Sequence, residues 1–160
     1  MIPVEPLTKA AFAPFGQVLE RDGAELRVIN GGTTDRLHAL AAVDVGAGGG
    51  RPIVSIFAGR RRPLPLEIAM LERHPLGTQC FFPLQPHDWL VVVGHFDEGA
   101  PILRCFRARG DQGVSYGVGV WHHPLLVLVP SQDFLVVDRE GPGANCDEVA
   151  FPAVHIDLAG

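Results

Sequence analysis

The sequence has little positive charge. Lys9 is the only lysine, lysine and arginine together number 13 against 18 acidic residues, and the formal net charge is -5. A protein with this balance is repelled by an extended polyanion unless one face gathers its arginines. The only basic run, Arg60-Arg61-Arg62, lies between Gly59 and Pro63 in a predicted loop, where a solvated turn is the ordinary explanation. We therefore expect no nucleic-acid partner.

Long apolar runs and paired cysteines are also lacking. Runs such as Leu90 to Val93 are far too short to span a bilayer, so we expect no membrane partner. The N-terminal residues show neither a secretory signal nor an arginine-rich transit peptide, which predicts a cytoplasmic location. Cys80, Cys105 and Cys146 are an odd number without C-x-x-C spacing, which argues against a disulfide framework or a zinc knuckle. We expect Cys80 and Cys105 to be buried thiols on strands.

Short β-branched and aromatic segments, separated by Gly, Pro, Asn and Asp, make up most of the chain, a pattern typical of strands. The expected strands are Gln17 to Glu20, Leu26 to Asn30, Leu37 to Val43, Pro52 to Phe57, Leu64 to Glu72, Cys80 to Leu84, Trp89 to Phe96, Ile102 to Phe106, Val118 to Trp121, Leu125 to Val129 and Phe134 to Asp138. No repeat or linker divides them, so we predict one all-β domain over residues 1–160, either a sandwich or a closed barrel. The 19 glycines and 14 prolines favour the barrel, which needs such residues at turns and bulges.

Only one helix is predicted, over Lys9 to Phe12, with the hydroxyl of Thr8 as its N-terminal cap. The glycine cluster at residues 46–50 is not followed by Gly-Lys-Ser/Thr or by a helix, so we interpret it as a flexible loop and not as a phosphate site. The tail from Gly141 onward has prolines and no periodicity, and we expect it to be irregular.

Two polar clusters frame the central strands: one runs from Glu72 to Gln79, and the other surrounds His122. If the strands form one curled sheet, alternate residues from both clusters face one cavity. His74 and His122 are the leading candidates for chemistry, because imidazole acts as a base, an acid or a metal ligand near neutral pH. A hydrogen-bonded structural role is the ordinary alternative for any single histidine, but Glu72 is expected to share a face with His74.

The two clusters resemble the metal motifs of the cupin barrels. Glu72-x-His74-x4-Gln79 is similar to the first motif, His-x-His followed by a glutamate, and Gly119-x2-His122 is similar to the second. The resemblance implies a ligand set of Glu72, His74, Gln79 and His122. Glutamate and glutamine replace the first histidine and the glutamate of the motif, and a set with one anionic ligand attracts a dication less strongly than a set with two.

More of the chain, from Pro6 to about Asp147, resembles the ureidoglycolate lyases, small cupins of allantoin breakdown. The matching segments are Glu72-Arg73-His74-Pro75-Leu76-Gly77-Thr78-Gln79, Trp121-His122-His123-Pro124-Leu125, Asn30-Gly31 with Arg36-x-His38, Asp133-Phe134-Leu135 and Asn145-Cys146-Asp147. The resemblance implies a cytoplasmic homodimer with a cupin-like barrel. It also implies cleavage of (S)-ureidoglycolate to glyoxylate and urea, in some cases with a divalent metal such as nickel.

This reaction needs a base for the substrate hydroxyl and an acid for the departing urea nitrogen. We expect His122 and either Glu72 or His74 to divide these roles. An arginine fork would suit the substrate carboxylate, and Arg73 and Arg36 are candidates, although strand alternation turns Arg73 away from Glu72 and His74 unless a bulge intervenes. The remaining candidates for substrate binding are Gln79, Asn30, His38 and His123.

Two other functions are open at this point. One is a hydrolase that releases ammonia from the same substrate, and the other is a cupin that binds a small acid or sugar without chemistry. Because urea is expelled from the substrate itself, no activated water is needed. We therefore expect that no cofactor is required, or that a divalent metal such as nickel or manganese is weakly bound.

Overall fold

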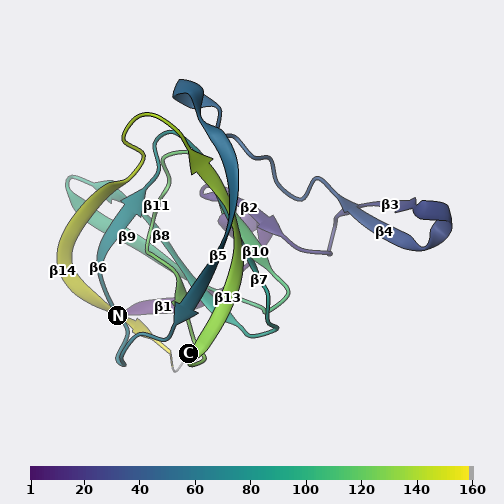
Figure 1. Cartoon of the computed structure of the whole chain (residues 1–160). Coiled ribbons are helices and arrows are strands. Elements are labelled where there is room, and N and C mark those ends of the chain that lie inside the picture. The colour runs from purple at the N-terminus through teal and green to yellow at the C-terminus, as the bar shows by residue number, and fades with distance from the viewer. Residues whose placement is uncertain (159–160) are drawn as a thin grey trace.

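The computed structural model describes residues 1–158 and consists mostly of strands (Figure 1), which confirms the predicted all-β, cupin-like class. The strands are β1 (Ile2–Pro6), β2 (Gly16–Leu19), β3 (Glu25–Ile29), β4 (Thr34–His38), β5 (Arg51–Arg60), β6 (Glu67–Arg73), β7 (Gln79–Pro83), β8 (Trp89–Asp97), β9 (Ala100–Ala108), β10 (Gly113–Tyr116), β11 (Trp121–His122), β12 (Leu126–Val127), β13 (Ser131–Glu140) and β14 (Asp147–Asp157). The helical elements are α1 (Lys9–Phe12) and the 3-10 turns η1 (Asn30–Gly32) and η2 (Ala47–Gly49). In residues 1–158, no helix is long and apolar enough to cross a membrane.

Six strands close into a ring in the order β6, β14, β1, β9, β8 and β11. The ring closes because the two residues of β11 pair on one side with β6 and on the other with β8. β12 pairs with another part of β8. A second sheet, in the order β2, β10, β7, β13 and β5, accompanies the ring.

Strand β8 shows how the two sheets share a core. Leu90 and Val92 belong to the apolar cluster of the ring, whereas Val91 and Val93 belong to the cluster shared with the second sheet. All four side chains are buried, as an uninterrupted apolar run on a central strand predicts. Burial of each such side chain stabilises the fold by about 1.5–3 kcal/mol relative to its exposure.

Helix α1 follows the prediction. The hydroxyl of Thr8 accepts a hydrogen bond from the amide of Ala11 at 3.1 Å. The helix carries Phe12 into the core, where its ring meets that of Phe106 nearly edge-on. Capping and burial together therefore fix this short element, which its length alone could not stabilise.

Three strands, β1, β10 and β14, were not predicted. β1 contains two prolines, which conceal a strand that pairs parallel with β14 in its first half and with β9 in its second. β10 begins at Gly113, and a glycine within a polar segment usually indicates a turn. A Cβ atom there would lie 2.4 Å from the carbonyl oxygen of Phe81, so glycine permits a close strand pairing.

The prediction of an irregular tail holds for residues 141–146 and is wrong from Asp147 onward, because β14 is a long strand paired with β6. Its pairing is interrupted between Ala150 and Val154, and Pro152 lies in that interruption. A proline is tolerated at such a bulge because it has no amide hydrogen to contribute to the ladder.

Several predicted strands have wrong bounds. The segment from Leu64 to Glu72 is a strand only from Glu67 onward. The segment from Leu37 to Val43 is extended only as far as His38, and the chain turns at Ala39, whose φ is 50°. The segment from Val118 to Trp121 begins with a turn, where Gly119 has a φ of 72°. Only Trp121 and His122 of that region form β11.

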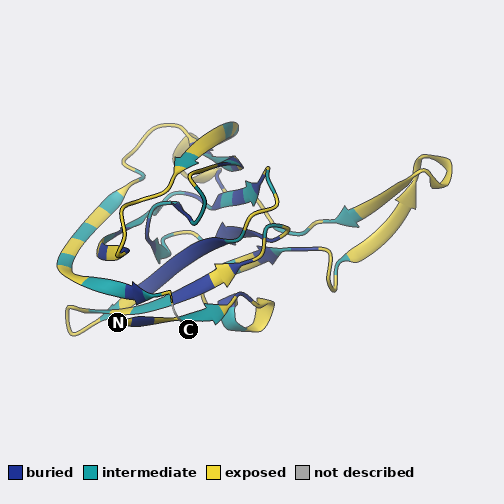
Figure 2. Cartoon of the chain, turned by 90° about the horizontal axis from the view of Figure 1, so that it is seen from below, coloured by how far each residue is buried: buried dark blue, intermediate teal, exposed yellow. Residues whose placement is uncertain are grey.

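Strands β3 and β4 form a hairpin that projects from the body of the molecule (Figure 1). We call residues 25–38 the arm. Its surface is mostly exposed, in contrast with the buried strands of the body (Figure 2). The tip contains Asn30, Gly31 and Gly32, all with positive φ, as predicted for a tight connection.

Candidate functional site

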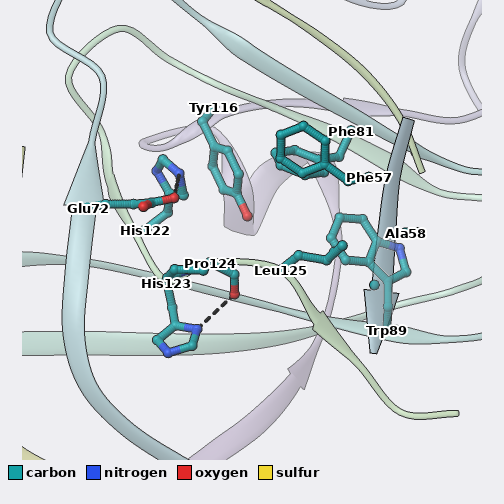
Figure 3. A pocket seen from close by; sticks show the side chains of 11 residues that line it. Phe57, Ala58, Glu72, Phe81, Trp89, Tyr116, His122, His123, Pro124 and Leu125 are labelled. Atoms are coloured by element: carbon teal, nitrogen blue, oxygen red, sulfur yellow. Dashed lines mark hydrogen bonds and ion pairs between the residues drawn. The ribbon is translucent and has the colours of Figure 1, made fainter. Parts of the chain in front are cut away.

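A cavity of about 350 Å³ lies between the ring and the second sheet. One part of its wall is aromatic and aliphatic, and the other carries titratable groups (Figure 3). The lining residues are Phe57, Ala58, Gly59, Glu72, Phe81, Trp89, Tyr116, His122, His123, Pro124 and Leu125. Among the residues of the described chain that line the cavity, none is lysine or arginine.

Glu72 and His122 meet because strands β6 and β11 place them directly opposite each other. The Oε1 atom of Glu72 lies 3.5 Å from Nε2 of His122. The Nδ1 atom of His122 donates to the carbonyl of Val120 at 2.9 Å, while Nε2 is buried and has no hydrogen-bond partner in the described chain. His122 therefore presents an uncommitted ring nitrogen beside a carboxylate.

The carboxyl group of Glu72 is held in its charged form. Interaction with His122 lowers its pKa, and this effect outweighs the opposing effect of burial. At neutral pH, Glu72 is thus an anion beside the imidazole. It is suited to stabilise a positive charge that develops on His122.

Tyr116 fixes the plane of the His122 ring. The two rings stack with centroids 4.0 Å apart and an interplanar angle of 10°. Burial raises the pKa of Tyr116 above its usual value, so the hydroxyl is neutral and can donate a hydrogen bond. In Figure 3, this hydroxyl points into the cavity. Tyr116 was not a predicted site residue, because the strand that carries it was not recognised.

His74 lies beside this pair, with its ring centroid 5.2 Å from that of His122. Its Nδ1 donates to the carbonyl of Asn145 at 2.7 Å, and its Nε2 lies 3.1 Å from Oε1 of Gln79. The amide nitrogen of Gln79 donates to Asp138 at 3.1 Å, which orients the glutamine. Both nitrogens of His74 thus lie beside oxygen atoms, of Asn145 and of Gln79, and these contacts fix the position of its ring.

A divalent metal would fit three of the predicted ligands. One ligand atom from each of Glu72, His74 and His122 lies within 4.8 Å of the others. Both histidines direct Nδ1 to a backbone carbonyl, which leaves Nε2 on the side of the carboxylate, as in many metal sites. The fourth predicted ligand, Gln79, instead occupies Nε2 of His74, and this hydrogen bond would have to be exchanged for a metal bond.

His123 is a neutral group at the same cavity. Its Nδ1 donates to the carbonyl of Pro124 at 2.8 Å. Burial lowers the pKa of His123 to about 4, and the charge of Arg62 acts in the same direction. At neutral pH, His123 is uncharged, and because its hydrogen is on Nδ1, its Nε2 can accept a hydrogen bond from a substrate.

Arg73 points away from the cavity, as strand alternation indicated. Its guanidinium donates to Asp147 at 2.9 Å and lies over the ring of Trp121 at 4.7 Å. The carboxylate and the aromatic face together hold the arginine on the other side of β6. The structure therefore does not place Arg73 where it could contact a substrate beside Glu72.

Asn30, Arg36 and His38 lie on the arm and not at the cavity of their own chain (Figure 1). The side chain of Asn30 donates to Thr34 at 3.2 Å within the arm. These three residues were predicted to bind the substrate, but the hairpin carries them away from Glu72 and His122 of their own chain. Sequence could not reveal this displacement, because no local pattern fixes the direction of a hairpin.

Comparison with known proteins gives one consistent result. The family model described as ureidoglycolate lyase matches residues 1–157. Ureidoglycolate lyase of Rhizobium etli (strain CIAT 652) is 52% identical over 149 residues, which cover 92% of this chain and 90% of the relative. The corresponding protein of Azotobacter vinelandii is 53% identical over 153 residues, covering 94% and 92%. Ureidoglycolate lyase 1 of Rhizobium meliloti is 52% identical over 157 residues, covering 98% and 92%.

Proposed function

Because the chain belongs to the ureidoglycolate lyase family, we propose that it is a carbon–nitrogen lyase that cleaves (S)-ureidoglycolate to glyoxylate and urea. The observation that carries the chemistry is the pair of buried His122 and partly buried Glu72 at the cavity. A carboxylate beside an uncommitted imidazole nitrogen can accept and return one proton without water taking part.

The reaction moves one proton and one electron pair. The substrate hydroxyl loses its proton, its oxygen forms the carbonyl of glyoxylate, and the electron pair of the carbon–nitrogen bond goes to the ureido nitrogen. That nitrogen then takes up a proton and leaves as urea. The proton that the hydroxyl loses is the one that the nitrogen takes up. The site therefore needs a group that holds this proton between the two steps.

We assign that role to His122. Its Nε2 is buried and has no hydrogen-bond partner in residues 1–158, so it is free to accept the hydroxyl proton. The carboxylate of Glu72 at 3.5 Å stabilises the imidazolium that forms, and the stacked ring of Tyr116 holds the imidazole in place. His122 then returns the proton to the departing nitrogen. Proton-transfer groups of this kind contribute about 10²- to 10⁴-fold to a rate.

His74 and Gln79 form the next group along the site. The orientation of Gln79 is set by Asp138, and Gln79 in turn holds His74 close to His122. We propose that His74 contacts the substrate beside His122, since the ring centroids of the two histidines lie 5.2 Å apart. Tyr116 is placed to donate a hydrogen bond to a polar group of the substrate, and Nε2 of His123 is placed to accept one.

A divalent metal remains compatible with this site. Held by Glu72, His74 and His122, it would supply positive charge for the carboxylate and hydroxyl of the substrate. We propose that such an ion is weakly bound and not required. The ligand set contains a single carboxylate, and Gln79 already occupies a nitrogen of His74.

One assay tests the proposed reaction. The purified protein is given (S)-ureidoglycolate, and glyoxylate, urea and ammonia are measured separately, with a reaction without protein as control. We expect urea and glyoxylate in equal amounts and no ammonia. Ammonia in place of urea would identify a hydrolase, and no turnover would leave a binding protein. The cytoplasmic location and the homodimer stay predictions.

A further inference from the structure

Arg139, near the end of β13, is an arginine with only 8% of its surface exposed. Buried arginines are usually paired with an acidic side chain. The guanidinium of Arg139 instead donates to backbone carbonyls. Its Nε and Nη2 atoms donate to Ala47 at 3.2 and 2.7 Å, and Nη2 also donates to Pro142 at 2.8 Å. Arg139 therefore joins two backbone segments, residues 44–50 and residues 141–146, that are far apart in the chain.

Glycines line the slot that holds this side chain. A Cβ atom on Gly50 would lie 2.2 Å from Nε of Arg139, and one on Gly77 would lie 3.0 Å from Cβ of Arg139. A Cβ atom on Gly141 would lie 2.8 Å from Cα of Gly50, so the two joined segments also contact each other closely. Glycine permits such close approaches because it has no side chain. The glycine cluster at residues 46–50 thus forms one wall of a slot for Arg139.

The segment of residues 141–146 reaches the candidate site through Asn145. The backbone carbonyl of Asn145 accepts the hydrogen bond from Nδ1 of His74 at 2.7 Å, and its side-chain oxygen accepts one from the amide of Leu76 at 2.8 Å. Residues 141–146 form no helix or strand, so no ladder of backbone hydrogen bonds fixes their position. The hydrogen bond from Arg139 anchors this segment three residues before Asn145.

The other joined segment supports the opposite side of the His74 ring. The amide of Thr78 donates to the carbonyl of Asp44 at 2.9 Å, and the hydroxyl of Thr78 accepts from the amide of Asp44 at 3.0 Å. Thr78 directly precedes Gln79, whose side chain lies 3.1 Å from Nε2 of His74. Both contacts that hold the His74 ring therefore come from parts of the chain that Arg139 joins.

We propose that Arg139 is a positioning residue of the candidate site: it fixes residues 44–50 and 141–146 to the end of β13, and these segments hold the ring of His74 beside His122. Arg139 does not line the cavity, so it acts only through these segments. The planar fork of an arginine suits this role, because it presents several donors in fixed directions. The expected effect on turnover rests on the proposed function, but the position of His74 can be measured without substrate.

Two substitutions disturb the slot in different ways, and we call them the slot variants. Arg139→Met removes the guanidinium and keeps a long side chain. Gly50→Ala keeps the arginine but places a methyl group 2.2 Å from its Nε and 2.2 Å from the carbonyl oxygen of Val45. The φ of Gly50 is -70°, which alanine adopts without strain, so the collision is the main effect.

Each slot variant has a matched control. Gly46→Ala changes a glycine of the same cluster, whose φ is -78° and whose added Cβ would meet nothing within 4 Å beyond its chain neighbours. Arg51→Met removes an arginine that pairs with Glu140 at the surface and whose side chain is 73% exposed. Circular dichroism verifies that the slot variants and the controls are folded at the temperature of the measurements. Should Arg139→Met fail to fold, Gly50→Ala carries the comparison.

Nitrogen-15 NMR of the imidazole rings measures the position of His74 in the absence of substrate. In the wild type, the Nδ1 proton of His74 should be protected from exchange with water by its bond to Asn145, and its signal is assigned by its loss in His74→Gln. We expect exchange at least about tenfold faster in both slot variants, because the segment that carries the acceptor opens more often. Both controls should retain the wild-type rate.

Turnover of (S)-ureidoglycolate by the folded proteins completes the test. We expect kcat to fall by about 10- to 100-fold in both slot variants, since a small displacement at the reacting centre has effects of this size, and to stay unchanged in both controls. If Arg139 only stabilised the fold, the slot variants would melt at lower temperature but keep the wild-type kcat and the protected His74 signal, and the proposal would be overturned. A wild type that releases no urea would refute the lyase function, whereas the exchange rates would still decide the role of Arg139.

Discussion

Replacement of Glu72 by glutamine should show how much the negative charge of this side chain, as distinct from its size, contributes to turnover. Glu72→Gln preserves the size of the side chain and an oxygen that can accept a hydrogen bond from His122 once Nε2 has taken up the proton. It removes the negative charge that lies 3.5 Å from Nε2. If His122 becomes an imidazolium during the reaction, the transition state loses more stabilisation than the substrate complex does. Turnover should therefore fall without unfolding the protein.

The geometry sets the size of the effect. Two unit charges 3.5 Å apart interact by about 5 kcal/mol at an effective dielectric constant of about 20. The side chain of Glu72 is 20% exposed, and solvent reduces this interaction. A net loss of about half that energy corresponds to a decrease in kcat of about 100-fold. The expected effect is thus far larger than the scatter of a steady-state assay.

The assay measures urea and glyoxylate from (S)-ureidoglycolate at saturating substrate, with thermal unfolding as a check on stability. Glu67→Gln is the matched control, because Glu67 begins the same strand and its side chain is 59% exposed beside His155. The control should keep wild-type turnover. If Glu72→Gln also kept wild-type turnover, the carboxylate would have no part in the chemistry, and the role assigned to His122 would lose its support.

Three further predictions follow from the same groups. His122→Ala should lower turnover by well over tenfold and leave the fold intact, and an unchanged rate would remove this imidazole from the mechanism. Activity should persist, in reduced form at most, after thorough treatment with EDTA; complete loss that nickel or manganese restores would show that Glu72, His74 and His122 act first as metal ligands. Burial lowers the pKa of His123 from 6.5 to about 4, so the unfolded chain binds more protons between these values, and the native state should lose stability on the order of 3 kcal/mol as the pH falls through that window. Urea denaturation at pH 7 and pH 4.5 measures the loss, which His123→Asn should reduce; an equal loss in both proteins would contradict the assignment.

Local patterns were sufficient where local forces decide the structure. The cap of α1 was predictable because a hydroxyl at Thr8 satisfies a free amide of the first turn, whatever the rest of the chain does. The buried strand β8 was predictable because its apolar run cannot remain in water. The direction of Arg73 followed from alternation along β6, since successive side chains of a strand point to opposite faces.

Proline and glycine misled the sequence interpretation at three strands. Pro3 and Pro6 lie in β1, Pro152 lies at a bulge of β14, and Gly113 permits a close pairing in β10. Proline and glycine are usually signs of turns, and only their neighbours in space show that these residues belong to strands. Tyr116 was not predicted as a site residue, because its strand, β10, was not among the predicted strands.

By itself, the sequence determined the all-β class, the short capped helix and the two polar clusters that contain Glu72, His74 and His122. The tertiary structure alone decided which of these side chains meet. Glu72 faces His122 because β11 closes the ring between β6 and β8, and this pairing joins segments that are distant in the chain. It also decided that Arg36 lies on the arm and not at the cavity. Strand order and hairpin direction depend on the packing of the whole molecule, and no short stretch of sequence encodes either.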